Sequence, residues 1–153
     1  MRFTTFYIAL IFILPLLAGC AEDNPFGTVY VEGTVTLDGT PIQEVSVTFI
    51  PVDGELSAGG ITDINGKFTL TTGGAPSGSG AKPGTYNVAF SKIEVEGAGL
   101  SEEEYMAKYR GGTPPVIYHI PQKYENPAAS GIEPITVGAD KANNKFTFAL
   151  TSQ

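Results

Sequence analysis

Apolar and polar residues alternate along several short stretches of the chain from residue 29 onward. In each stretch every second side chain is apolar, as in a strand that buries one face. The apolar members, which we expect to form the core, are Val29, Val31, Val35, Leu37, Val45, Val47, Phe49, Phe68, Leu70, Tyr86, Val88, Phe90, Ile135, Val137, Phe146, Phe148 and Leu150. Turn residues separate the rows, and a further short segment lies around 58–62. Six or seven short strands at this spacing predict an all-β fold, a seven-stranded β-sandwich.

Two turns between these rows carry chemically distinctive residues. Asp38 and Gly39 end the first row, and the sequence Asp63-Ile64-Asn65-Gly66 joins two later ones. Gly66 supplies the positive φ that a tight hairpin turn needs. Asp63 and Asn65 also resemble the opening of a calcium loop, but the later acidic ligands of such a loop are missing. We therefore expect a plain turn, and neither a metal ion nor a cofactor.

Residues 93–131 separate two rows by more than a usual connection, so we interpret them as an insertion. Ser101 and Glu104 have the spacing of a capping box, which predicts one short helix from about Glu102 to Arg110. The apolar run 116–120 behind the helix suits an edge strand.

The first residues of the chain have the pattern of a signal peptide. Arg2 precedes an apolar run of twelve residues, Phe6–Leu17. A membrane-spanning helix needs about 20 apolar residues, and the charges of Glu22 and Asp23 close this stretch sooner. We expect residues 1–19 to be removed on export.

The end of this run, Leu17-Ala18-Gly19-Cys20, resembles the lipobox of bacterial lipoproteins. The resemblance implies that the Cys20 thiol receives a diacylglyceryl group and that cleavage makes Cys20 the acylated N-terminus, with residues 20–28 as a tether. The bilayer is then a partner of the chain. Ala21, where inner-membrane lipoproteins carry aspartate, implies the outer membrane of the cell envelope. The alternative is an ordinary secretory signal that is cut nearby.

Charge and cysteine content narrow the classes of partner. The chain carries a formal charge of −7, and loss of Arg2 with the signal leaves 8 Lys and Arg against 16 Asp and Glu, a charge of −8. Such a surface repels phosphate backbones, so we expect no nucleic-acid partner. Cys20 is the only cysteine, which leaves no partner for an internal disulfide.

A series of motifs between residues 29 and 92 resembles a known domain family. In chain order they are Val31-x-Gly33-x-Val35, Asp38-Gly39-x-Pro41-Ile42, Val45-x-Val47-x-Phe49, Thr62-Asp63-x-Asn65-Gly66-Lys67-Phe68 and Pro83-Gly84-x-Tyr86-x-Val88. They are similar to carboxypeptidase regulatory-like domains, whose fold is a transthyretin-like (prealbumin-like) Ig-like Greek-key sandwich. Further on, Ile120-Pro121-x-Lys123-Tyr124 and Ser130-Gly131-Ile132 resemble small secreted lipoproteins that carry this domain. The chain length and the strand pattern predict one domain over residues 29–151. The resemblance implies that this domain is noncatalytic, with no catalytic residue to carry over.

The insertion holds the candidate binding residues. They are Tyr105, Tyr109, Arg110, Tyr118, His119 and Tyr124. Tyrosine and arginine make binding surfaces at a small cost in side-chain entropy. The alternative, favoured because tyrosine is often a half-buried packing residue, is that these rings pack the insertion onto the sandwich and cover a sheet edge.

The sequence leaves three functions open. The leading hypothesis is a noncatalytic envelope lipoprotein that acts as a structural or protein-interaction module. The second is a carbohydrate-binding module that uses the tyrosines of the insertion to stack on envelope or plant glycans. The third is a hydrolase centred on His119, although the sequence has no Gly-x-Ser-x-Gly elbow and no metal-ligand cluster.

Overall fold

The computed structural model describes residues 24–153, which are mostly β-sheet with two short α-helices. The strands are β1 (Glu32–Leu37), β2 (Thr40–Pro41), β3 (Ser46–Pro51), β4 (Ala58–Ile61), β5 (Lys67–Thr69), β6 (Thr71–Thr72), β7 (Gly84–Ser91), β8 (Ile93–Val95), β9 (Val116–Tyr118), β10 (Ile135–Val137) and β11 (Lys145–Leu150). The helices are α1 (Glu102–Tyr109) and α2 (Pro127–Ser130), with 3-10 turns η1 (Gln122–Glu125) and η2 (Lys141–Asn143). An all-β chain was predicted. The described part divides into more strands than the seven expected, since several contain only two or three residues.

The predicted signal peptide and lipobox, including Leu17, Ala18, Gly19 and Cys20, lie outside the described residues. Within residues 24–153 the structure contains no helix that is both long and apolar enough to cross a membrane.

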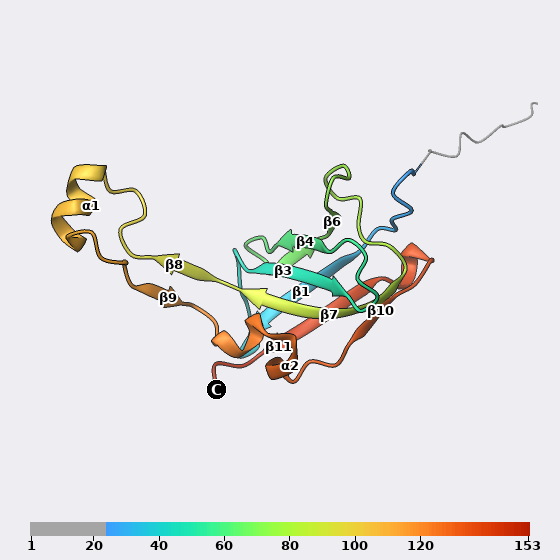
Figure 1. The fold of residues 1–153 in the computed structure, drawn as a ribbon. Coiled ribbons are helices and arrows are strands. Elements are labelled where there is room, and N and C mark those ends of the chain that lie inside the picture. The colour runs from blue at the N-terminus through green and yellow to red at the C-terminus, as the bar shows by residue number, and fades with distance from the viewer. Residues whose placement is uncertain (1–23) are drawn as a thin grey trace, which may run out of the picture.

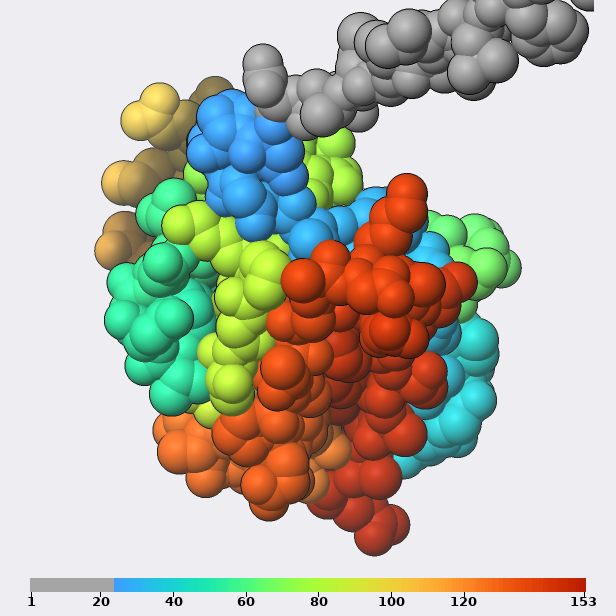
Figure 2. Space-filling view, turned by 90° about the vertical axis from the view of Figure 1, so that its right-hand side faces the viewer, coloured from blue at the N-terminus to red at the C-terminus, as the bar shows by residue number. Residues whose placement is uncertain are grey.

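Two sheets form the body of the molecule (Figure 1). In the first sheet β1 is central: it pairs in parallel with β11 on one side and antiparallel with β5 and β2 on the other. The second sheet has the strand order β10-β7-β3-β4-β6, and all its pairs are antiparallel. Figure 2 looks at the side of the body that lies farthest from α1, with β11 in red.

The core lies between these two sheets. Phe49 of the second sheet faces three rings of the first sheet, with centroid distances of 6.3 Å to Phe68, 5.7 Å to Phe146 and 6.2 Å to Phe148. Each apolar residue predicted for the core is either buried or packed against the buried cluster. The apolar sides of the two sheets therefore pack against one another, and burial of these side chains supplies the main stabilisation of the fold.

The first of the two turns singled out in the sequence is a hairpin turn, whereas the second connects β4 of the second sheet to β5 of the first, so the hairpin predicted there is not formed. Asp38 and Gly39 both adopt positive φ, 49° and 83°, and connect β1 to β2. In the second turn the Asp63 carboxylate accepts hydrogen bonds from the backbone N–H of Asn65 at 2.8 Å and of Lys67 at 2.9 Å. The Asp63 side chain thus stabilises its own turn, which explains its position by local geometry.

Candidate interaction site

The connection that follows β7 leaves the body as an arm, which we define as residues 92–119. In the arm β8 pairs antiparallel with β9, and α1 closes the far end (Figure 1). The backbone N–H of His119 donates to the Lys92 oxygen at 2.9 Å, so the two ends of the arm lie side by side. Of the run 116–120, predicted as an edge strand, residues 116–118 form β9, which pairs with β8 in a separate two-stranded sheet and not with the strands of the body.

One face of this two-stranded ribbon is apolar. The register pairs Ile93 with Tyr118 and Val95 with Val116, and because side chains alternate along a strand these four lie on the same face. Their exposed fractions are 51% for Ile93, 44% for Tyr118, 39% for Val95 and 41% for Val116. An isolated two-stranded hairpin is at best marginally stable in water. A contiguous apolar face left exposed on such a ribbon is an unusual feature of the molecule.

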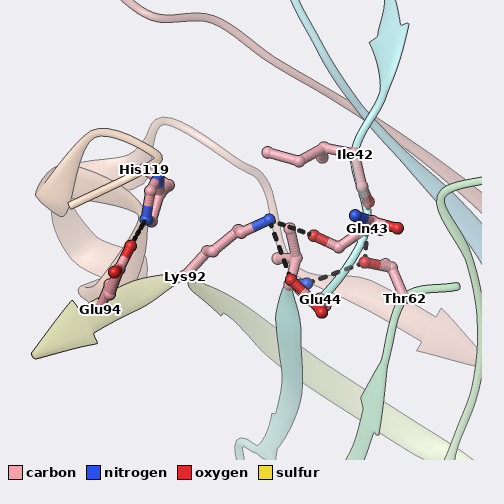
Figure 3. Close-up of polar contacts among 8 residues, drawn as sticks. Ile42, Gln43, Glu44, Thr62, Lys92, Glu94 and His119 are labelled. Carbon is pink, nitrogen blue, oxygen red and sulfur yellow. Dashed lines mark hydrogen bonds and ion pairs between the residues drawn. The ribbon is translucent and has the colours of Figure 1, made fainter. Parts of the chain in front are cut away.

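The opposite face of the ribbon is largely polar. Glu94 pairs across the strands with Ile117, and the Glu94 carboxylate oxygen lies 3.0 Å from Nε2 of His119 (Figure 3). Both partners of this contact are well exposed, so it contributes little to stability. The face of the ribbon that carries Glu94 and His119 is therefore the hydrophilic one.

Lys92 fastens the base of the arm to the body. Its ammonium group donates to the Gln43 backbone oxygen at 2.8 Å and lies 3.5 Å from the Glu44 carboxylate (Figure 3). Only 18% of the Lys92 side chain is exposed. The Thr62 hydroxyl steadies the same segment, since it donates to the Ile42 oxygen at 2.8 Å and accepts from the Val45 N–H at 2.9 Å. The direction of the arm is therefore set by contacts with the loop before β3.

The helix at the tip begins at Glu102 as predicted and ends at Tyr109, one residue earlier than predicted. Ser101 and Glu104 form the capping box: the Ser101 hydroxyl accepts from the Glu104 N–H, and the Glu104 carboxylate accepts from the Ser101 N–H at 2.9 Å. The Ser101 hydroxyl and then its N–H, both donating to the Glu104 carboxylate, lower the pKa of that group. Arg110 caps the C-terminus of the helix with a left-handed φ of 50°.

Side chains of the tip also contact one another and the ribbon. The rings of Tyr105 and Tyr109 are tilted together with centroids 5.0 Å apart. Lys108 forms an ion pair of 2.8 Å with Glu96, just beyond β8, and this partner is the main cause of a raised pKa of Lys108. These contacts hold α1 on the end of the ribbon.

The chain returns to the body directly after the arm. Ile120 and Tyr124 are buried members of the core, 3% and 5% exposed. The Tyr124 hydroxyl accepts from the Thr151 N–H at 2.9 Å, and the Ser91 hydroxyl donates to the Glu125 carboxylate at 2.9 Å. The prediction that Tyr124 belongs to a binding surface is wrong, because its ring packs residues 120–125 against the sandwich.

The remaining predicted residues all lie in the arm, but they do not form one continuous surface. Tyr105, Tyr109 and Arg110 lie at the tip, whereas Tyr118 and His119, as neighbours in sequence, point to opposite faces of the ribbon. Of these tyrosine rings, only Tyr124 packs against the body in the buried cluster. Sequence reasoning missed the apolar members of the ribbon, although the alternation in Ile93-x-Val95 and Val116-x-Tyr118 was a signal for them.

The arm carries no arrangement that would bind a metal. No group of three or more His, Cys, Asp and Glu side chains within residues 24–153 is placed to hold an ion. Comparison of the chain with protein families, with curated proteins and with solved structures finds no match.

Proposed function

We propose that the protein is a noncatalytic, lipid-anchored module of the cell envelope that holds another envelope protein through its arm. The observation that carries this proposal is the apolar ribbon face of Ile93, Val95, Val116 and Tyr118, all exposed. Burying such side chains is favourable by about 25 cal/mol per Å² of apolar surface, so a protein partner with a matching apolar strand or groove would stabilise the arm.

The position of the arm supports this role. The described chain starts, in blue, at the end of the body opposite α1 (Figure 1). A lipid chain on Cys20 would therefore hold one end of the molecule at the membrane while the arm extends away from it. Acyl chains contribute about 0.8 kcal/mol per buried methylene, so such a domain needs no membrane-binding surface of its own.

The finer fold belongs to the same proposal. We assign the two-sheet body to the prealbumin-like, Ig-like Greek-key sandwiches of carboxypeptidase regulatory-like domains. The support is the motif series of residues 29–92 together with the antiparallel pairing of β3 with β4 and β7. A noncatalytic role agrees with this assignment and with the exposed position of the His119 and Glu94 pair.

The anchor is tested by fractionation of cells that express the full chain. We expect Cys20→Ala to move the protein from the membrane fraction to the soluble fraction and to abolish labelling with radioactive palmitate. Ala21→Asp is the matched control, which should leave the protein membrane-bound but transfer it to the inner membrane. If Cys20→Ala still sediments with membranes, the anchor is not at Cys20.

The arm is tested by a photo-reactive amino acid placed in the full chain in living cells. Positions Ile93 and Val116 should yield one defined adduct with an envelope protein, and Tyr118→Glu should abolish it because it puts a charge on the apolar face. Val52 and Leu56, 59% and 57% exposed on the body, are the control positions. Adducts of equal yield at the control positions, or none at the arm, would contradict the role of the arm.

A further inference from the structure

A groove with a volume of about 620 Å³ lies on the outer face of the first sheet, away from the arm. Ligand sites in proteins commonly measure about 300 to 1,000 Å³. Its floor follows from strand register: Thr34 of β1 is paired with Lys67 of β5 and Thr147 of β11. The next outward row along the same strands is Glu32, with Thr69 and Lys145 on either side. Six polar side chains thus form a regular grid across three strands.

The grid offers both donors and acceptors of hydrogen bonds. The hydroxyls of Thr34, Thr69 and Thr147 line the groove, and a hydroxyl can both donate and accept a hydrogen bond. The two oxygens of Glu32 are already engaged, one 2.8 Å from Lys145 Nζ and one 3.1 Å from the Tyr30 hydroxyl. Glu32, Lys145 and Tyr30 are therefore held in place before any ligand arrives, which reduces the ordering cost of binding.

The charges that line the groove cancel. Lys67 and Lys145 are balanced by Glu32 and by Asp63 at the rim. Phosphate or carboxylate ligands would meet as much repulsion as attraction here, so the lining favours an uncharged ligand. A chain with a formal charge of −7 adds to the bias against anions.

Two apolar side chains flank this polar floor. Tyr30 is 41% exposed and Ile61 is 69% exposed, and both line the groove. The Tyr30 ring, fixed by its hydrogen bond to Glu32, offers a rigid flat surface at low entropic cost. A ligand for this groove needs apolar faces for Tyr30 and Ile61 and many hydroxyl groups for the floor.

We propose that the groove binds a neutral oligosaccharide. A pyranose ring has apolar C–H faces that stack on an aromatic ring, and its hydroxyls both donate and accept, which matches the lining on each count. This site uses none of the insertion tyrosines and none of the arm. Its test is therefore independent of the function proposed above.

The test is calorimetric titration of the full chain in detergent with neutral hexasaccharides of glucose, xylose, mannose and N-acetylglucosamine, and with hexagalacturonate as the anionic probe. We expect at least one neutral sugar to bind, and hexagalacturonate to bind more weakly than that sugar. Tyr30→Ala should weaken binding by about tenfold or more, as loss of an aromatic anchor does. Thr147→Val, which removes a hydroxyl at nearly constant volume, should weaken binding several-fold.

Tyr118→Ala on the arm is the matched control and should leave the affinity unchanged. Circular dichroism shows whether each variant is folded, and because Tyr30 and Thr147 are both exposed their replacement should not disturb the core. The proposal is overturned if no neutral sugar binds, if hexagalacturonate binds best, or if binding survives both Tyr30→Ala and Thr147→Val unchanged.

Discussion

The backbone of Gly80 passes so close to Val29 that a methyl group on Gly80 would lie 1.8 Å from the Val29 carbonyl oxygen. The two segments meet there through an isolated β-bridge, in which Val29 and Ala81 exchange backbone hydrogen bonds of 2.8 and 3.0 Å. This bridge joins the segment before β1 to the segment that leads into β7. The two backbones can approach so closely because Gly80 has no side chain.

We predict that Gly80→Ala strongly destabilises the protein, while Gly78→Ala destabilises it less. Both glycines have positive φ, 85° and 74°, so each alanine carries the left-handed strain of about 1 to 2 kcal/mol. Only Gly80→Ala adds a backbone clash, because a methyl group at Gly78 meets nothing within 4 Å. Urea unfolding should show a loss for Gly80→Ala that exceeds the loss for Gly78→Ala by about 2 kcal/mol or more. Equal midpoints would mean that the two segments separate readily.

The fastening of the arm gives a second prediction. Lys92→Met should loosen the arm, since a hydrogen bond to a charged group contributes about 1.5 to 3 kcal/mol and this one joins the base of the arm to Gln43. Hydrogen exchange of the β8 and β9 amides should accelerate while exchange in β3 stays slow. Lys108→Met, which breaks an exposed ion pair near the tip, is the control. Unchanged exchange at the base in Lys92→Met would show that backbone contacts alone hold the arm.

A third prediction concerns the charged pair on the first sheet. Hydrogen bonds from Lys145 first, and from Tyr30 second, hold the pKa of Glu32 below its ordinary value of about 4.5. The same carboxylate raises the pKa of Lys145 above 10.5. Because the pKa of Glu32 is lowered in the folded protein, Glu32 stabilises the folded state at pH values above its ordinary pKa. This stabilisation is lost as the pH falls through the folded-state pKa. Because the pKa of Lys145 is raised in the folded protein, Lys145 stabilises the folded state at pH values below its ordinary pKa. This stabilisation is lost as the pH rises through the folded-state pKa. The pair therefore favours folding between about pH 4.5 and 10.5.

Removal of the lysine tests this pair. In Lys145→Met the pKa of Glu32 should move up toward its ordinary value, measured by a carboxyl NMR titration. Lys82→Met, which breaks the ion pair of Lys82 with Glu55, should leave the Glu32 titration where it was. A Glu32 titration that is the same in Lys145→Met and in the unaltered protein would show that Lys145 does not hold this carboxylate in solution.

The body of the molecule could be predicted from the sequence because its signal is local. Alternation of the type seen in Val45, Val47 and Phe49 sets which side of a strand is buried, whatever strand lies beside it. The capping box of Ser101 and Glu104 is equally local, so the helix was predicted to within a residue of its end.

The arm and the groove were not predictable in this way, because both depend on which strands pair. The run that contains Val116 and Tyr118 indicates a strand, but not that its partner is β8 rather than the sandwich. Tyr124 has no alternating pattern around it, since it lies in a 3-10 turn, and its burial follows from where the chain returns. The groove grid depends on the register of three strands, which a single alternating row does not give.

The last prediction asks whether the arm is a separate unit of stability. The buried core contains no residue of the arm, and the arm ends meet at the hydrogen bond from His119 to Lys92. A two-residue Asn-Gly turn between Lys92 and His119 should therefore replace residues 93–118 without disturbing the fold. We expect the free energy of unfolding in urea to change by less than about 1 kcal/mol, because an isolated two-stranded ribbon contributes little net stability. A comparable deletion of β4, which pairs with β3 inside the second sheet, should unfold the protein. If removal of the arm also unfolds it, the arm supports the sandwich and its apolar face cannot be reserved for a partner.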